Sequence, residues 1–359
     1  MKFRILLVVT LAWLVAQLDV TLYQLTTAVR GVHELLRLPQ SDIDACTAAY
    51  EFFQARQDGT STQAGSTAEE TEHVRAYYRV LNYVLAVADI EKMYIPPQID
   101  SKHGLFQNQL LLEQRVFDSL QLPPNKSDTR LLDIGCGRGR IAHHAARFTG
   151  ARVTGFNIDE TQIHNAIAYA EETGLGDRLD FSVGDHHQPF QYADASFDGA
   201  YSFQALWPFF KQHELEGVAA EMFRVLKPGA RFSCSEYLLT PNFDWADSRH
   251  VQLHKLFLPT LAATQSNYPA HVTEALERVG FKLVLSAPSV APAWPLTDQK
   301  TDLFLWMRSL IRGLVNVGLL EPWAETLVNN LLLGGQAWAD AEKAKLADLN
   351  WQIIVEKPV

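Results

Sequence analysis

Cysteine and clustered basic residues are both scarce in this chain of 359 residues. Its three cysteines, Cys46, Cys136 and Cys234, are too few and too scattered for a disulfide framework or a tetrahedral zinc site, so no metal is predicted. Acidic residues exceed basic ones, 41 to 31. Because phosphate backbones are bound by clustered Lys and Arg, this balance argues against a nucleic-acid partner. With 47% apolar residues, the chain has a globular composition.

Long apolar runs are also scarce, and the clearest lies at the start of the chain. After the basic residues Lys2 and Arg4, residues 5–18 are almost all apolar. The run is short for a spanning helix, which needs about 20 residues, and a small-x-small cleavage site is poorly matched after it. Residues 1–30 are therefore predicted to be a retained membrane-associated helix, with an uncleaved packing helix and a signal peptide as alternatives. This predicts a place at the cytoplasmic face of a membrane such as the endoplasmic reticulum, or otherwise in the cytoplasm.

A helical region, residues 31–120, is predicted from apolar spacing, and a polar stretch interrupts it. Residues 57–72 are rich in Gly, Ser and Thr and end in several acidic residues. Such a segment buries too little apolar surface to offset its ordering entropy, so it is predicted to be a flexible linker. Pro123 and Pro124 then mark the start of a different region.

Strands and helices alternate in residues 121–240. Strands are predicted at 130–134, 151–156, 179–183, 199–203 and 231–237, and helices at 141–148, 160–173 and 213–226. Short crossovers between successive strands are typical of right-handed parallel units, which predicts an α/β fold with a doubly wound, Rossmann-like sheet. The remaining part, residues 241–359, is predicted to be a mostly helical extension with strands at 281–287 and 350–356.

A glycine-rich turn joins the first of these strands to the first helix. Gly135, Gly137 and Gly139 occupy alternate positions in it. Glycine permits positive φ and close approach of a ligand to the backbone, and the helix that follows presents free N–H groups. A dinucleotide turn would need Gly in place of Arg140, and a phosphate loop would need Gly-Lys-Ser or Gly-Lys-Thr. Neither phosphate motif is present.

The turn instead suits S-adenosylmethionine, whose amino-acid end has no phosphate and carries an ammonium and a carboxylate. Asp133 could pair with the ammonium, directly or through water, and backbone N–H groups of the turn could face the carboxylate. Polar groups also follow the next two strands, at the edge where open α/β sheets bind ligands. Asn157, or else Asp159 or Glu160, could bind the ribose hydroxyls, and Asp159 could equally cap the following helix.

The adenine amino group has its own candidate, Asp185, which follows the third strand. The full set of predicted cofactor-binding residues is Asp133, Gly135, Cys136, Gly137, Gly139, Asn157, Ile158, Gln162, Gly184, Asp185 and His186.

These motifs together resemble the class I S-adenosylmethionine-dependent methyltransferases, and more narrowly the sterol C24-methyltransferase family. The narrower resemblance rests on residues 157–163, 197–201 and 224–229, and on Gly334 and Gly335 in the tail, and it covers about residues 75–357. It implies transfer of a methyl group to a bulky apolar small molecule, of the sterol, terpenoid or polyketide type used in secondary metabolism. A homo-oligomer is compatible with it.

Two segments depart from the family pattern, and both lie on its acceptor side. The family has Glu-Ala-Thr-Cys-His after the fourth strand, where this chain begins with Gln204 and Ala205, and its Gly-Trp-Gly is absent after residues 89–97. Gln204 removes a negative charge near a carbocation, which makes O- or N-methylation, the first alternative to sterol C-methylation, more plausible here than in the parent family. A second alternative is a cyclase or pseudoenzyme that binds the cofactor without transferring its methyl group.

Aromatic and titratable side chains supply the acceptor-side candidates. Ring faces can stabilise a carbocation without quenching it, and equally they can be ordinary core. The rings predicted to bind the substrate are those of Phe203, Trp207, Phe209 and Phe210. The predicted catalytic residues are His186, His187, Gln204 and Tyr94, with Asp89 and Glu91 as further candidates for the base.

Overall fold

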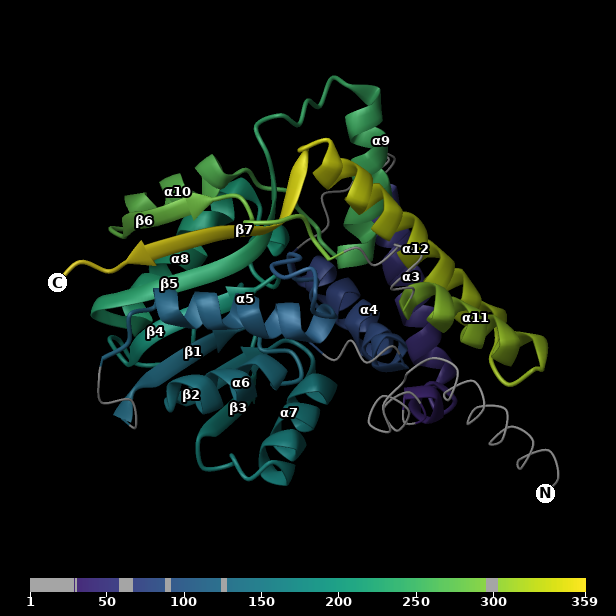
Figure 1. Cartoon of the computed structure of the whole chain (residues 1–359), viewed down its shortest axis with the longest axis horizontal. Coiled ribbons are helices and arrows are strands. Elements are labelled where there is room, and N and C mark those ends of the chain that lie inside the picture. The colour runs from purple at the N-terminus through teal and green to yellow at the C-terminus, as the bar shows by residue number, and fades with distance from the viewer. Residues whose placement is uncertain (1–28, 30, 58–66, 88–91, 124–127, 295–302) are drawn as a thin grey trace.

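The computed structural model describes residues 29, 31–57, 67–87, 92–123, 128–294 and 303–359 (Figure 1). The predicted membrane-associated helix at residues 1–30 therefore lies outside the described residues, except for Val29. Among the helices that are described, none is both long enough and apolar enough to cross a membrane.

A seven-stranded sheet forms the centre of the described structure. The strands are β1 (Arg130–Ile134), β2 (Arg152–Asn157), β3 (Leu179–Val183), β4 (Phe197–Phe203), β5 (Leu226–Leu239), β6 (Lys282–Ala287) and β7 (Ala347–Glu356). Their order is β3-β2-β1-β4-β5-β7-β6. The first five strands pair in parallel, whereas β7 is antiparallel to both β5 and β6. The predicted doubly wound α/β sheet is confirmed, and the two C-terminal strands extend it.

Helices cover both faces of this sheet. They are α5 (Leu105–Ser119), α6 (Arg140–Thr149), α7 (Glu160–Glu172), α8 (Leu215–Val225) and α10 (Pro269–Arg278). Successive residues of a strand point to opposite faces. Accordingly, Leu131 joins the buried cluster beneath α5, α6 and α7, while Leu132 joins the cluster that contains α8 and α10.

A second group of helices lies to one side of the sheet (Figure 1). It consists of α3 (Gln40–Gln57), α4 (Thr67–Val87), α9 (Ser248–Phe257), α11 (Leu303–Asn316) and α12 (Pro322–Lys343). The helix pairs α3 with α4, α9 with α12, and α11 with α12 pack together, and α3 also meets α9. Helices from the predicted regions 31–120 and 241–359 therefore pack together in one helical group, while α5, α10 and the last two strands belong to the sheet and its covering helices.

The bounds predicted for the flexible linker, residues 57–72, are wrong at both ends. Gln57 is the last residue of α3, and residues 67–72 form the start of α4, where Glu70 and Thr71 are buried. The acidic residues that indicated a solvated linker lie in the first turn of α4, where they interact favourably with the helix dipole.

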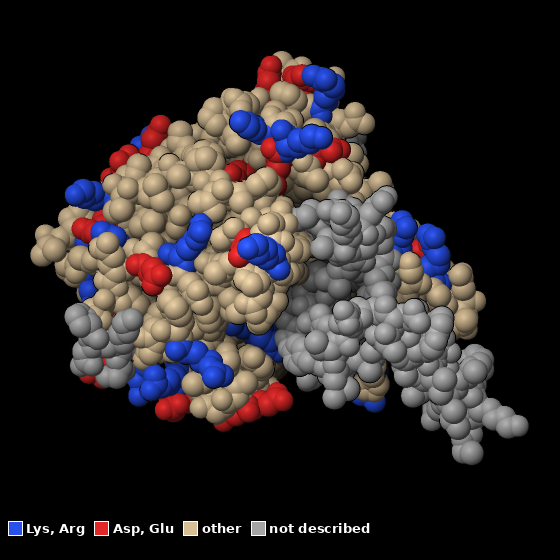
Figure 2. All heavy atoms as spheres, in the orientation of Figure 1, with Lys and Arg blue, Asp and Glu red and all other residues tan. Residues whose placement is uncertain are grey.

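Charged side chains are distributed without a dominant sign on the face shown in Figure 2. Basic and acidic residues alternate over the described surface there, in agreement with the absence of a basic cluster in the sequence.

Candidate active site

A cavity lies at the carboxyl ends of β1, β2 and β3, with α4 as its opposite wall. It is lined by Gly135 and Gly137 of the glycine turn, by Asn157 at the end of β2, by Gly184 after β3, and by Tyr78 of α4. The space between the protein atoms amounts to about 1010 Å³, its open mouth included. This is the edge at which open α/β sheets bind ligands.

The glycine turn brings bare backbone to this cavity. Gly135 and Gly137 both have positive φ, 78° and 52°. A Cβ on Gly135 would lie 2.5 Å from the Cβ of Ala205, and one on Gly137 would lie 3.3 Å from Oε1 of Gln162. Side chains are therefore excluded where the backbone faces the cavity, as the sequence predicts.

Gly139 has a packing role and does not line the cavity. A Cβ added at this position would lie 2.8 Å from side-chain atoms of both Ala166 and Phe181. The lack of a side chain therefore lets α6 pack against α7 and β3. By contrast, Cys136 and Ile158 both line the cavity.

Asp133 lies behind the turn, outside the cavity wall. It is 2% exposed, and its Oδ2 accepts a hydrogen bond of 3.2 Å from the Tyr201 hydroxyl. Burial raises the pKa of Asp133 to about 8, although the hydrogen bond from Tyr201 opposes the shift. Of the two predicted contacts between Asp133 and the cofactor's ammonium, this position is compatible with the one through water and not with the direct one.

The end of β2 presents a pair of amides to the cavity. Nδ2 of Asn157 donates to Oε1 of Gln162 over 3.0 Å, and both residues line the cavity. Asp159 is fully buried and accepts a hydrogen bond of 2.8 Å from the backbone N–H of Gln162, which makes it the N-cap of α7. Of the two interpretations of Asp159, the structure shows the cap.

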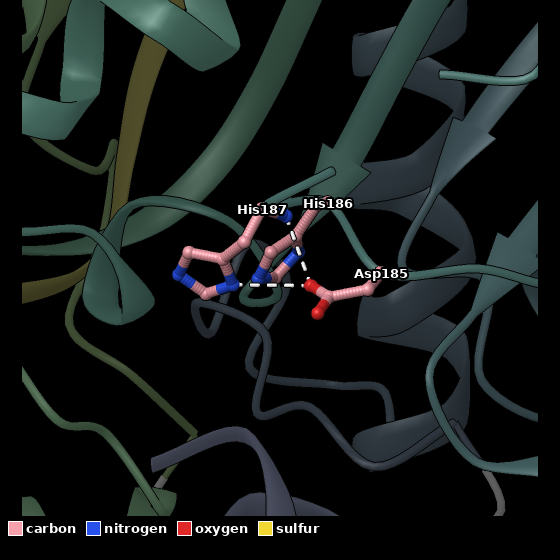
Figure 3. A group of neighbouring side chains, drawn as sticks. All are labelled: Asp185, His186 and His187. Atoms are coloured by element: carbon pink, nitrogen blue, oxygen red, sulfur yellow. Dashed lines mark hydrogen bonds and ion pairs between the residues drawn. The ribbon is translucent and has the colours of Figure 1, made fainter. Parts of the chain in front are cut away.

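After β3, Asp185 and His187 are joined by hydrogen bonds (Figure 3). Oδ1 of Asp185 accepts from the backbone N–H of His187 at 2.9 Å and lies 3.1 Å from its Nδ1. Nε2 of His187 lies 3.0 Å from the carbonyl oxygen of Phe209. Burial disfavours a charged ring, but the hydrogen bonds to Asp185 and Phe209 outweigh it and raise the pKa of His187.

These bonds bear on the roles predicted for Asp185 and His187. Oδ1 of Asp185 is hydrogen-bonded to His187, and Asp185 does not belong to the cavity lining, whereas Gly184, His186 and His187 do. The adenine contact of Asp185 stays a prediction. The ligand atoms of Asp185, His186 and His187 lie within 4.8 Å of one another. Both ring nitrogens of His187 already face protein oxygens, so the group braces the Phe209 segment instead of presenting a free metal ligand or base.

His186 packs against two aromatic rings. Its centroid lies 4.9 Å from that of Phe210 and 5.7 Å from that of Phe209. Burial lowers the pKa of His186 to about 3. An imidazole of such low basicity is poorly matched to proton abstraction at neutral pH, so the predicted role as catalytic base finds no support in this geometry.

Tyr94, another predicted base, does not line this cavity, and its hydroxyl is committed elsewhere. The hydroxyl donates to Oε1 of Glu113 at 2.6 Å, and burial raises the pKa of Tyr94 well above its ordinary value. The buried Glu113 also pairs with Lys92 at 2.6 Å and with His144 at 2.5 Å. Its partners come from distant parts of the sequence, so no local pattern singled out Glu113.

Gln204 lies at a strained backbone position just after β4, with a φ of 50°. Its Nε2 lies within hydrogen-bonding distance of the carbonyl oxygens of Ile95 (3.1 Å) and Leu349 (3.0 Å) and of Oδ1 of Asn350 (3.2 Å). The side chain lines the cavity and also ties two distant segments to β4. Gln204 is therefore a positioning residue.

Glu236, which sequence reasoning did not select, holds the backbone that follows Gln204. It is fully buried, and its carboxylate accepts hydrogen bonds from Ser202 (2.7 Å) and from the backbone N–H groups of Ala205 (3.1 Å) and Leu206 (3.3 Å). Burial raises the pKa of Glu236 to about 7. The available signal was that Glu236 is the one acidic residue of β5.

The four aromatic candidates divide into two pairs. Phe203 and Phe209 line the cavity. Trp207 is 1% exposed and donates from Nε1 to Sγ of Cys234 over 3.4 Å, and Phe210 packs on His187 with 4.4 Å between ring centroids. The prediction that Trp207 and Phe210 line the acceptor pocket is wrong, because the 3₁₀ turn Trp207–Phe209 directs Trp207 to the core and Phe209 to the cavity.

The part of the chain that carries this geometry matches a known family. Residues 131–229 match the methyltransferase domain family. The matched range begins in β1 and ends within β5, so it includes the glycine turn, the amide pair and the segment with Asp185 and His187.

Longer relatives and solved structures extend this result. The chain is 35% identical over 244 residues to squalene methyltransferase 1 of Botryococcus braunii, which covers 64% of this chain and 62% of that protein. It is 26% identical over 343 residues to 24-methylenesterol C-methyltransferase 2 of Oryza sativa subsp. japonica, with 90% of each covered. The structure of the [4+2]-cyclase SpnF superposes with a TM-score of 0.59 at 21% identity, over 80% of this chain and 97% of that one.

The match to the squalene methyltransferase thus spans about 62% of that protein's length. The likeness to the cyclase structure shows a shared fold. Residues 131–229 of this chain match a methyltransferase domain, the sheet is Rossmann-like, and the chain resembles the sterol and squalene methyltransferases.

Proposed function

We propose that this chain is an S-adenosylmethionine-dependent methyltransferase whose acceptor is an apolar small molecule of the sterol, terpenoid or polyketide type. One observation carries the proposal. The bare backbone of Gly135 and Gly137 faces the same cavity as the rings of Phe203 and Phe209. A methyl donor held at the turn would therefore meet an acceptor held by the rings.

The residues present fit this cofactor. The backbone of Gly135 and Gly137 would hold the amino-acid part of the cofactor. The buried carboxyl of Asp133 would contact its ammonium through a water molecule. The amides of Asn157 and Gln162 would bind the ribose hydroxyls. Gly184 presents no side chain to the cavity, and the neighbouring side chains of Phe156 and Ile158 are apolar, which suits the flat face of adenine.

The protein's part in the reaction is alignment and exclusion of water. S-adenosylmethionine supplies an electrophilic methyl group on a sulfonium, and an in-line displacement requires the acceptor atom to be held against it. The hydrogen bond from His187 to the Phe209 carbonyl fixes the segment that carries the Phe209 ring. Ring faces of Phe203 and Phe209 can stabilise positive charge, at about 0.5–2 kcal/mol for each contact.

Methyl release tests the proposal. The full chain, incubated with tritium-labelled cofactor and with squalene or lanosterol in phosphatidylcholine vesicles, is expected to produce labelled organic extract and an equal amount of S-adenosylhomocysteine. The matched control is the same protein without an acceptor. Tight cofactor binding without product from either acceptor would contradict the proposal for this substrate class and favour a non-methylating cyclase or pseudoenzyme.

A place at a membrane is a second part of the proposal, and the sequence alone supports it. The apolar run at residues 5–18 and a lipid-soluble acceptor both suit an enzyme held at the cytoplasmic face. The vesicles of the same assay give the readout. The full chain should float with them, whereas flotation of a chain that begins at residue 31 would show that the run is not required.

Phe209 and Trp207 are expected to differ when each is replaced by alanine. Phe209→Ala removes a ring from the cavity and should lower turnover roughly tenfold while cofactor affinity stays within about twofold. Trp207→Ala empties a core position and should cost about 3–5 kcal/mol of unfolding free energy. Steady-state kinetics, cofactor titration and urea unfolding measure these effects. Equal loss of turnover in both folded variants would contradict the division.

A further inference from the structure

Three cavities follow one another from the glycine turn to the surface beside α12. The first is the cavity described above. It shares Tyr78, Met93, Gln204 and Phe209 with a middle cavity of about 840 Å³, open space included. The middle cavity shares Ile95, Gly335, Trp338 and Leu349 with an outer cavity of about 1830 Å³, counted in the same way.

The outer cavity reaches solvent. Asn242, Lys343 and Lys345 belong to its lining, and all three side chains are exposed. Because neighbouring cavities share lining residues, the outer cavity borders the middle one along α12, and the middle one borders the cavity of the glycine turn at Gln204.

The middle cavity offers its occupant little hydrogen bonding. The hydroxyl of Tyr78 donates to the carbonyl of Leu261 at 2.9 Å, and that of Tyr94 to Glu113 at 2.6 Å. The hydroxyl of Tyr237 pairs with Ser266 at 2.8 Å. The remaining lining of this cavity is largely aliphatic and aromatic. Apart from the buried indole N–H of Trp338, which has no hydrogen-bond partner among the described residues, this lining suits a hydrocarbon.

Helix α12 presents one face to this passage. Leu331, Gly335 and Trp338 lie at spacings of four and three residues, which places them on one side of a helix, and all three line the middle cavity. Trp338 is fixed by stacking on Phe257, with 4.2 Å between ring centroids. Gly335 is the smallest residue on this face.

The two adjacent glycines of α12 have different surroundings. A Cβ on Gly334 would lie 2.1 Å from Cγ2 of Thr260, so Gly334 permits close helix packing. A Cβ on Gly335 would meet no atom within 4 Å. A side chain at 335 would therefore project into open space at the junction of the middle and outer cavities.

We infer that the acceptor is an elongated hydrocarbon whose reacting end lies beside Gln204 and Phe209 and whose body passes Gly335 into the outer cavity. This inference rests on the proposed function and adds the length and path of the substrate. It assigns Gly335 as a specificity-determining residue. It also gives residues 241–359 a function, because α12 forms the wall that sets how long an acceptor the site can take.

Binding of a fluorescent sterol tests the inference. Dehydroergosterol, delivered from cyclodextrin, is detected in the full chain by energy transfer from tryptophan. Wild-type protein should bind it saturably, and squalene should compete. Gly335→Phe should weaken binding by roughly tenfold or more, because the ring fills the passage, and Gly335→Ala should have a smaller effect. S-adenosylhomocysteine affinity should stay unchanged in both variants.

Gly217→Phe is the matched control. Gly217 is also helical, in α8, with nothing within 4 Å of its Cβ position, and it lies outside the three cavities. Thermal unfolding checks that Gly335→Phe is folded, and removal of a helical glycine should not lower its stability.

The outcomes separate the inference from the proposed function. Wild-type sterol affinity in Gly335→Phe would overturn the path. Failure of wild-type protein to bind the sterol or squalene while it binds S-adenosylhomocysteine would overturn the elongated acceptor and leave the cofactor assignment standing. Failure to bind S-adenosylhomocysteine would instead contradict the proposed function.

Discussion

Replacement of Gly137 by valine is expected to abolish cofactor binding in a chain that remains folded. Gly137 has a φ of 52°, a conformation that β-branched residues rarely adopt. A Cβ there would lie 3.3 Å from Oε1 of Gln162, which itself belongs to the proposed ribose contact. The backbone would have to move where it faces the cavity, so calorimetric titration should show a loss of S-adenosylhomocysteine affinity of roughly 100-fold or more.

Gly174→Val separates backbone strain from loss of the site. Gly174 has a φ of 70° and is exposed after α7, with no atom within 4 Å of its Cβ position. Both variants should lose about 1–3 kcal/mol of stability from strain. Only Gly137→Val should lose the cofactor, and equal affinity in the two variants would show that the turn does not hold it.

Asp133→Asn is expected to weaken cofactor binding and, at the same time, to stabilise the protein at high pH. Burial raises the pKa of Asp133 to about 8 from an ordinary value of 3.8, so the folded chain retains a proton there that the unfolded chain loses. The sign follows from linkage. Where the folded state binds more protons, stability falls as pH rises, here between pH 4 and 8.

Asparagine keeps the shape of Asp133 but cannot ionise. Between pH 4 and 9, the unfolding free energy of the wild-type chain should fall by up to roughly 5 kcal/mol more than that of Asp133→Asn. Cofactor affinity should fall roughly tenfold or more, because asparagine, unlike Asp133, cannot ionise when the ammonium binds. Urea unfolding across this pH range and calorimetry measure both effects, with Asp118→Asn on the exposed face of α5 as the control. Parallel pH profiles for wild type and Asp133→Asn would show that Asp133 is already ionised in the folded chain.

The cofactor half of the site follows from local sequence. Residues 179–183 were predicted as a strand and form β3, and the glycine turn adopts the positive φ values that its composition indicates. Both features are set by neighbours in the chain: alternation of apolar residues defines the strand, and missing side chains define the turn. This is why a single sequence suffices for them.

The acceptor half depends on contacts between distant residues. From the sequence Tyr94 is a candidate base, yet its hydroxyl donates a hydrogen bond to Glu113, 19 positions away. The orientation of Trp207 to the core and Phe209 to the cavity results from a 3₁₀ turn held by Glu236 and His187. Gly335 contributes through empty space between α12 and the turn that follows β4, which no sequence pattern describes. Such features require the assembled fold.

The central claim is that the bare backbone of Gly135 and Gly137 holds the amino-acid end of S-adenosylmethionine. A crystal structure of the full chain with S-adenosylhomocysteine tests it most directly. We expect that end of the ligand to lie against the two glycines, with its sulfur directed toward Phe209 and Gln204. Ligand bound elsewhere, or a turn that stays free at saturating ligand, would contradict the claim.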